Sequence, residues 1–183
     1  AFVVVSLILA CVVVSGQVEE VCLWVLLVVL NSIDVLFKVS PKINAAGRME
    51  HGRLAVDLLI ENDAYEALEM AKVLEKHNTA RRESDQLITV EALEQIEEQI
   101  ADDAYSTVVY RPDWHKGVIG IVASRLIERH YRPTIVLTES NGLLAGSARS
   151  VLGFDVYDAI NECSEYLEQF GGHMYAAGMT MKP

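Results

Sequence analysis

Apolar and polar positions divide the 183-residue sequence into three parts. Residues 1–32 are almost wholly apolar, residues 33–103 show mainly helical spacing, and residues 104–183 alternate short strand-like and helix-like runs. Such alternation is typical of an α/β domain. We therefore predict an α/β fold, in which a mixed β-sheet flanked by helices follows a long interdomain helix.

The apolar first part does not match a membrane segment or a signal peptide. A spanning helix needs about 18 or more uninterrupted apolar residues, whereas Gly16, Glu19 and Glu20 interrupt this stretch. The sequence also lacks the initial Met and basic residues of a signal peptide. We interpret residues 1–32 as buried strands and a buried helix, a remnant of a preceding catalytic domain. A membrane or secretory segment and an unreliable stretch of sequence are the alternatives.

Residues 33–103 are expected to form a linker loop and a long connecting helix. Val35 to Val39 alternates imperfectly before Pro41 and predicts a short strand that ends in a turn. A loop of small residues at 44–48 and a helix at 54–60 should follow. Asp63 then caps the longest helical pattern, which ends at residue 100.

This long helix is apolar at both ends and polar in its middle. Between Glu75 and Gln86, Ala80 is the sole apolar residue. A helix of this kind is expected to pack on one domain, cross solvent and pack on a second domain. Two helices joined by a turn near His77 and Asn78 are the alternative.

Residues 104–183 are expected to contain four strands and two helices. The strands are predicted at 107–110, 134–137, 143–148 and 178–181. An Asn141-Gly142 turn should open the third strand. The helices are predicted at 118–130 and 156–170, the second of which should stop at Gly171 and Gly172.

Charge and cysteine content limit the possible functions. The formal net charge of −11 argues against a protein whose whole surface clings to nucleic acid, but it allows a local basic groove. The three cysteines are widely spaced and odd in number, so neither a zinc site nor a disulfide framework is indicated. A reduced, cytoplasmic setting is therefore expected.

Four short clusters of small residues and hydrogen-bond donors are candidates for anion binding. They lie at 44–48, 114–117, 146–150 and 171–178. Small residues let a backbone approach a ligand closely, and the free N–H groups of a helix that begins near Gly117 favour an anion. A tight turn, an ordinary helix start, a solvated strand end and a structural histidine are the simpler alternatives.

The donors within the clusters suit a phosphate. Arg48 offers a forked guanidinium, and His115 precedes the expected helix start. Ser147 and Arg149 are two residues apart on a predicted strand and should point to the same side. His173 follows two glycines whose backbone N–H groups could face a ligand.

Catalytic metal ligands are not evident. A two-metal hydrolase needs several carboxylates and histidines that converge on paired cations. The sequence contains no Asp-His-His triplet and no Asp-x-Asp. We therefore predict that this chain binds no catalytic metal.

Taken in order, the clusters resemble the signature motifs of the bacterial RecJ family. The first is similar to Arg-Ile-Asn-Ala-Ala-Gly-Arg-Met, with Lys42 in place of Arg. The second resembles His-Pro-Gly-Val-Ile-Gly-Ile-Val-Ala-Ser-Arg, with Lys116 in place of Pro. The third resembles Gly-Ser-Gly-Arg-Ser, with Ala148 for the second Gly, and the fourth resembles Gly-Gly-His-x-x-Ala-Ala-Gly. The resemblance covers about residues 33–183.

The resemblance implies a part of a 5′-to-3′ exonuclease specific for single-stranded DNA, which acts in repair and recombination. An N-terminal DHH domain of the same protein would hold manganese or magnesium, and residues 104–183 would form the DHH-associated, nucleic-acid-binding domain. Single-stranded DNA is the implied ligand, a membrane is not, and a single-strand-binding protein or a helicase is an allowed partner. A phosphodiesterase for short RNAs or cyclic dinucleotides, and a binding module without catalysis, are the alternatives.

The implied site is a phosphate pocket. By motif, Ser147 and Arg149 would hold the 5′-terminal phosphate with Arg48 and His173 beside them. Asn44, His115 and Gly172 would support these groups. We therefore expect the side chains of Arg48, Ser147, Arg149 and His173 to converge on one cleft.

Overall fold

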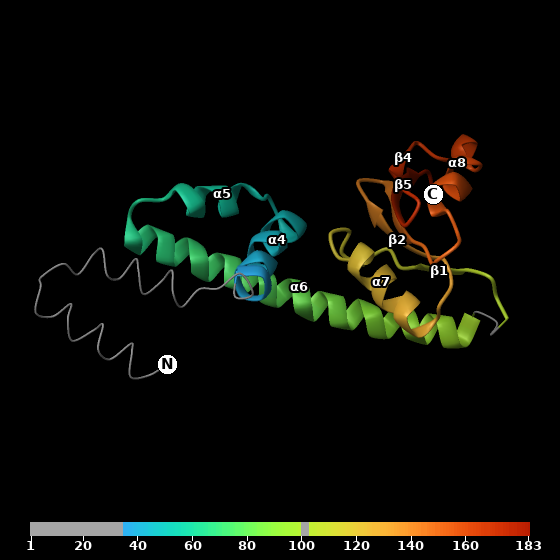
Figure 1. The fold of residues 1–183 in the computed structure, drawn as a ribbon, viewed down its shortest axis with the longest axis horizontal. Helices are drawn as coiled ribbons and strands as arrows, with labels where there is room; N and C mark the ends of the chain where they lie inside the picture. Colours follow the sequence, from blue (N-terminus) through green and yellow to red (C-terminus); the bar gives the residue numbers. More distant parts are fainter. Residues whose placement is uncertain (1–34, 100–102) are drawn as a thin grey trace, which may run out of the picture.

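A computed structural model of the protein describes residues 35–99 and 103–183 (Figure 1). The expected apolar segment at 1–32 lies outside the described residues. The first described elements are helical: η1 (Val35–Val39), α4 (Ser40–Met49), α5 (Arg53–Ile60) and α6 (Ala64–Gln99). The rest of the chain forms β1 (Thr107–Tyr110), α7 (Ile119–Arg129), β2 (Thr134–Ser140), β3 (Leu143–Arg149), α8 (Val156–Asn161), η2 (Ser164–Tyr166), β4 (Gln169–His173) and β5 (Ala176–Met181).

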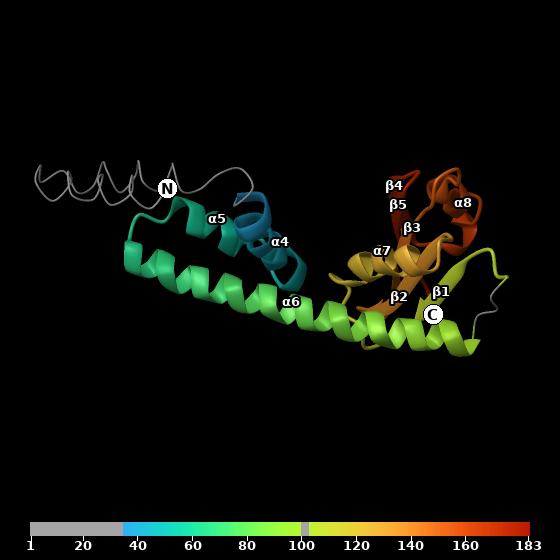
Figure 2. The same cartoon turned by 60° about the horizontal axis from the view of Figure 1, so that its bottom comes forward.

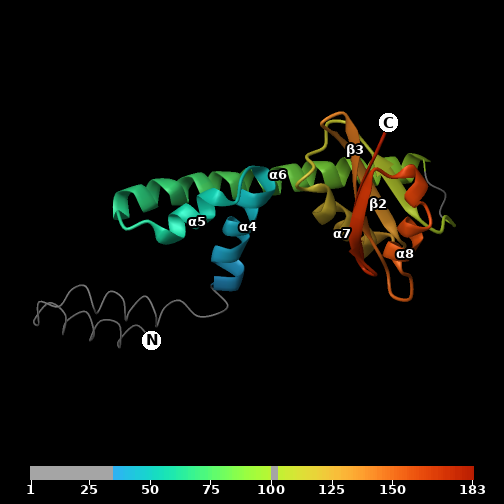
Figure 3. The same cartoon turned by 90° about the horizontal axis from the view of Figure 1, so that it is seen from above.

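The five strands form one mixed sheet in the order β1-β2-β3-β5-β4. β1 and β2 are parallel, and the other neighbours are antiparallel. Helices α7 and α8 lie on opposite sides of the strands (Figure 3). The α7 side contains the larger apolar core, with Val122, Leu126 and Val136 fully buried. The predicted α/β class, with a mixed sheet after a long helix, is confirmed.

Helix α6 connects the two halves of the structure. It runs along α4 and α5 and then along α7 and β1, as Figures 1 and 2 show. The Asp63 carboxylate accepts hydrogen bonds from the backbone N–H groups of Tyr65 (2.8 Å) and Glu66 (3.0 Å). The predicted cap is therefore confirmed. The helix is continuous, so the alternative of two helices with a turn near His77 and Asn78 is wrong.

The polar middle of α6 is exposed on one face, as predicted, and buried on the other, which was not predicted. Asn78 is 7% exposed and Asp85 is 1% exposed, so these residues continue the buried stripe between Leu74 and Ile88. Asp85 Oδ2 accepts a hydrogen bond from Arg125 Nη2 of α7 at 2.9 Å and lies 3.7 Å from Arg81 Nη1. Buried polar groups are tolerated when they are paired. Asp85 thus joins the middle of α6 to α7, whereas Asn78 accepts a hydrogen bond from Arg81 of the same helix at 3.2 Å.

The structure of the segment before α5 differs from the prediction. Residues 35–39 form a π-helical turn instead of a strand, and residues 44–48 belong to α4 instead of a loop. Pro41 caused the first error, because proline ends strands but is also tolerated in the first turn of a helix. Ala45 and Ala46 explain the second error: both are buried, and their small size lets α4 pack closely on its neighbours.

The helix predicted at 156–170 is also wrong beyond residue 161. α8 ends at Asn161, and residues 169–173 form β4, so Gly171 and Gly172 lie in a strand and do not stop a helix. β4 pairs with β5 over its whole length. Leu167 and Phe170 pack on the core beneath α8. Strand pairing and this apolar contact outweigh the local helical pattern.

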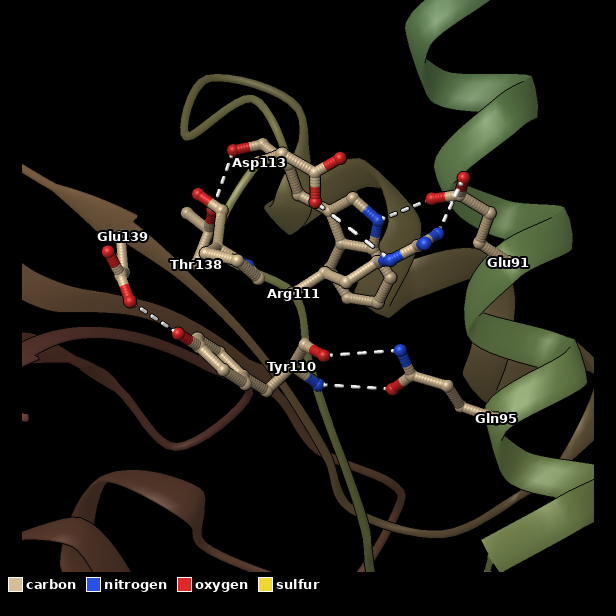
Figure 4. A network of polar contacts seen from close by, with 9 residues as sticks. Glu91, Gln95, Tyr110, Arg111, Asp113, Thr138 and Glu139 are labelled. Atoms are coloured by element: carbon tan, nitrogen blue, oxygen red, sulfur yellow. Dashed lines mark hydrogen bonds and ion pairs between the residues drawn. The ribbon is translucent and has the colours of Figure 1, made fainter.

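A polar network fastens α6 to β1 and to the loop that follows it (Figure 4). Glu91 accepts a hydrogen bond from Trp114 Nε1 (2.7 Å) and forms an ion pair with Arg111 (2.7 Å). The side-chain amide of Gln95 donates to the Tyr110 carbonyl and accepts from the Tyr110 N–H. Gln95 thereby occupies the free edge of β1.

We predict that Trp114→Phe lowers the free energy of unfolding by about 1.5–3 kcal/mol, because a buried hydrogen bond to a charged carboxylate is lost. Urea denaturation measures the change. Tyr105→Phe, at a side chain that is 95% exposed, is the control and should have little effect. Equal stability of Trp114→Phe and wild type would contradict the role of this network.

Candidate phosphate-binding site

One face of the sheet carries the predicted donors. Ser147 and Arg149 alternate on β3, so their side chains share a face. Across the sheet, Ser147 is paired with Gly178 and then Gly171, and Arg149 is paired with Ala176 and then His173. Directly opposed residues also share a face. Beside Ser147, the floor therefore exposes backbone without side chains, because its neighbours on β5 and β4 are Gly178 and Gly171.

This face forms the floor of a cavity of about 540 Å³. The α4 end, the turn before α7 and the first turn of α7 contribute its wall, and β3, β4 and β5 contribute the floor. Among the described residues, three cationic side chains line it, and no aspartate or glutamate does. In a chain of net charge −11, such a lining marks a local site for an anion. The cationic residues are Arg48, Lys116 and Arg149.

Arg149 and Ser147 are held together at the base of the cavity. Arg149 Nη1 donates to Ser147 Oγ at 3.1 Å and to the Ala148 carbonyl at 2.8 Å. Gly120 of α7 lies directly above them: a Cβ atom there would be 2.9 Å from both Arg149 Nη2 and Ser147 Oγ. The absent side chain of Gly120 leaves room for the guanidinium.

Arg48 reaches the same cavity from the helical half. Its Nη1 donates to the Gly117 carbonyl at 3.3 Å. The two backbones touch at this point, since a Cβ on Gly117 would clash with the Arg48 carbonyl oxygen. The close approach of α4 to the turn before α7 thus places Arg48 opposite Arg149.

The electrostatics of the pair favour an anion. The pKa of the Arg149 guanidinium is lowered from its ordinary value, first by partial burial and second by the charge of Arg48. Both causes disfavour an unpaired cation. A phosphate between the two guanidinium groups would offset both, through charge-assisted and forked hydrogen bonds.

The remaining predicted residues are not part of the cavity lining. His173 is on the same sheet face, at the exposed end of β4, where its Nδ1 accepts the Tyr175 N–H at 3.3 Å. His115 Nδ1 accepts the Gly117 N–H at 3.1 Å and so shapes the turn. Asn44 is exposed on α4. A Cβ on Gly172 would clash with the Ala176 carbonyl, so this glycine permits the pairing of β4 with β5.

Two residues of the cavity lining were not predicted from the sequence. Gln169 and Thr180 are paired across β4 and β5 at the open end of the floor. The misassigned helix hid Gln169, because a residue of a surface helix would not reach the sheet. Recognition of β4 as a strand would have placed both residues on the floor beside Ala145.

A comparison with domain families identifies the second half of the chain. The family model described as the DHHA1 domain matches residues 103–183. The match includes every strand of the sheet and most of the cavity.

The chain as a whole matches one region of RecJ proteins. It is 44% identical over 154 residues to the single-stranded-DNA-specific exonuclease RecJ of Bacillus subtilis, which covers 83% of this chain and 20% of the relative. The RecJ of Escherichia coli is 35% identical, with 84% of this chain and 28% of the relative covered. The chain thus spans only 20% to 28% of the length of these relatives.

Solved structures show the same fold. A crystal structure of Thermus thermophilus RecJ in complex with Mg²⁺ superposes with a TM-score of 0.73 at 32% identity, over 82% of this chain and 23% of that one. An exonuclease RecJ bound to manganese gives the same TM-score at 31% identity, over 83% and 37%. The described part of the chain therefore shares the fold of the matching region of these RecJ structures.

Within residues 35–99 and 103–183, no three His, Cys, Asp or Glu side chains are grouped so that they could hold a metal ion. Over the same ranges, none of the helices combines the length and apolar character needed to cross a bilayer.

We predict that Gly120→Ala abolishes the stabilisation of the protein by inorganic phosphate, because the added methyl group displaces the ends of Arg149 and Ser147. Wild type at phosphate concentrations tenfold above the dissociation constant should gain about 1.4 kcal/mol. Thermal unfolding with and without phosphate measures this. Gly52→Ala, where the nearest atom is 3.8 Å from the added Cβ, is the control. Equal phosphate stabilisation of Gly120→Ala and wild type would contradict the assignment.

Proposed function

We propose that this chain supplies the 5′-phosphate- and single-strand-binding part of a 5′-to-3′ exonuclease specific for single-stranded DNA, acting in repair and recombination. The observation that carries the proposal is a cavity lined by Arg48, Ser147 and Arg149, whose described lining contains no carboxylate. The relatives that the chain matches are named as exonucleases of this specificity.

A terminal phosphate fits this cavity better than an internal one. It has more free oxygens and more negative charge than a phosphodiester, and two forked guanidinium groups and a hydroxyl can use them. A strand held by its end is positioned for removal of terminal nucleotides. His173 remains a proposed phosphate-binding residue, and Asn44, His115 and Gly172 keep their proposed supporting roles.

The reaction itself would take place on another part of the protein. The metal-bound RecJ structures contain Mg²⁺ or Mn²⁺, and we propose that manganese or magnesium is held by a DHH domain outside the described residues. In that arrangement the DHHA1 domain binds and orients the strand, and the metal supplies activated water. A cytoplasmic setting and a single-strand-binding protein or a helicase as partners remain predictions from the sequence.

We predict that Arg149→Ala weakens binding of 5′-phosphorylated single-stranded DNA by about 1.5–3 kcal/mol, because a charge-assisted hydrogen bond is lost. Fluorescence anisotropy with a 3′-labelled oligonucleotide measures the dissociation constant. Arg129→Ala removes the same charge from an exposed position at the end of α7 and serves as the control. Unchanged affinity of Arg149→Ala would refute the site.

The same assay separates the proposed ligand from its main alternative. A domain that serves a long single strand should bind long oligodeoxynucleotides more tightly than a 5′-phosphorylated dinucleotide. Tighter binding of the dinucleotide would favour a phosphodiesterase of short RNAs or cyclic dinucleotides.

A further inference from the structure

Lys116 is the third cation of the cavity, and the phosphate contacts proposed above do not use it. Its side chain is exposed at the mouth, in the turn before α7. It has no hydrogen bond or ion pair with any residue in the described part of the chain, whereas Lys42, Lys72 and Lys182 are paired with Glu75, Glu69 and Glu168.

The positive charge of Lys116 exceeds the charge needed to balance one terminal phosphate. A phosphate monoester carries about −1.5 to −2 at neutral pH, which the two guanidinium groups of Arg48 and Arg149 already balance. Lys116 directly precedes Gly117, whose carbonyl oxygen accepts a hydrogen bond from the Arg48 guanidinium. A third positive charge next to a balanced pair is therefore available for a further anion.

The two sides of the cavity mouth differ in charge. On the sheet side the lining residues are uncharged: Gln169, Phe170, Met179 and Thr180. On the α7 side the mouth carries Lys116. The nearest carboxylate in sequence, Asp113, is 72% exposed and lies 3.9 Å from Arg111, so it does not neutralise Lys116.

From this asymmetry we propose that Lys116 binds the second phosphate of the strand and so directs the strand out of the cavity along the α7 side. The site then recognises two successive phosphates, the terminal one between Arg48 and Arg149 and the next one at Lys116. A flexible lysine is suited to a phosphodiester, which needs a point charge and no forked geometry. The inference rests on the proposed function, because it assumes that a strand end occupies the cavity.

The test compares the salt dependence of binding for 5′-phosphorylated and 5′-hydroxyl oligodeoxythymidylate, both labelled at the 3′ end. Each phosphate contact to a single strand contributes about 0.7 to the slope of log affinity against log salt concentration. Lys116→Ala should reduce the slope by about 0.7 for both strands, because both have the internucleotide phosphate. Lys116→Arg should restore the slope, and Lys182→Ala, at an exposed lysine paired with Glu168, should leave it unchanged.

Arg149→Ala distinguishes the two claims. It should weaken binding of the phosphorylated strand alone, since the hydroxyl strand has no terminal phosphate. Equal weakening of both strands by Arg149→Ala would overturn the proposed end recognition and leave the Lys116 measurement interpretable. A Lys116→Ala slope equal to wild type, or a change confined to the phosphorylated strand, would overturn the assignment of Lys116 to the second phosphate.

Discussion

Arg48 and Arg149 come from different halves of the structure, yet their guanidinium groups face one cavity. The repulsion between like charges opposes this arrangement and contributes to the lowered pKa of Arg149. Packing elsewhere must therefore maintain it. The contact of the Arg48 backbone with Gly117 and the missing side chain of Gly120 provide this packing. An anion in the cavity would offset the repulsion, so the proposed affinity for phosphate depends on how the elements are packed.

Helix α6 supports both sides of this contact. α4 packs on its first half, α7 packs on its second half, and the Glu91 and Gln95 side chains attach it to the β1 region. The arginines at this interface have a carboxylate: Arg125 and Arg81 both lie near Asp85. Within residues 35–99 and 103–183, the arginines of the cavity have none. Arginine therefore stabilises the interface where its charge is matched, and we propose that it binds the ligand where its charge is unmatched.

Much of this architecture could be predicted from the sequence, and the errors have physical causes. Local signals such as the Asp63 cap and the Asn141-Gly142 turn, where both residues have positive φ, were predicted correctly. The alternation of Ser147 and Arg149 was predicted correctly too. β4 was missed, because its pairing with β5 depends on a partner strand and not on its own pattern. The burial of Asn78 and Asp85 was not predicted. Asn78 is hydrogen-bonded to Arg81 one turn along the same helix, and Asp85 is hydrogen-bonded to Arg125, which is distant in sequence. The local polar pattern does not reveal either pairing.

The most direct test of the account follows the two arginines themselves. Nitrogen–proton NMR spectra of the arginine side chains, recorded while inorganic phosphate is added, report on each guanidinium separately. If one anion lies between the two groups, the Arg48 and Arg149 signals will shift together and give the same dissociation constant. Movement of only one signal, or two unrelated dissociation constants, would contradict a shared phosphate site.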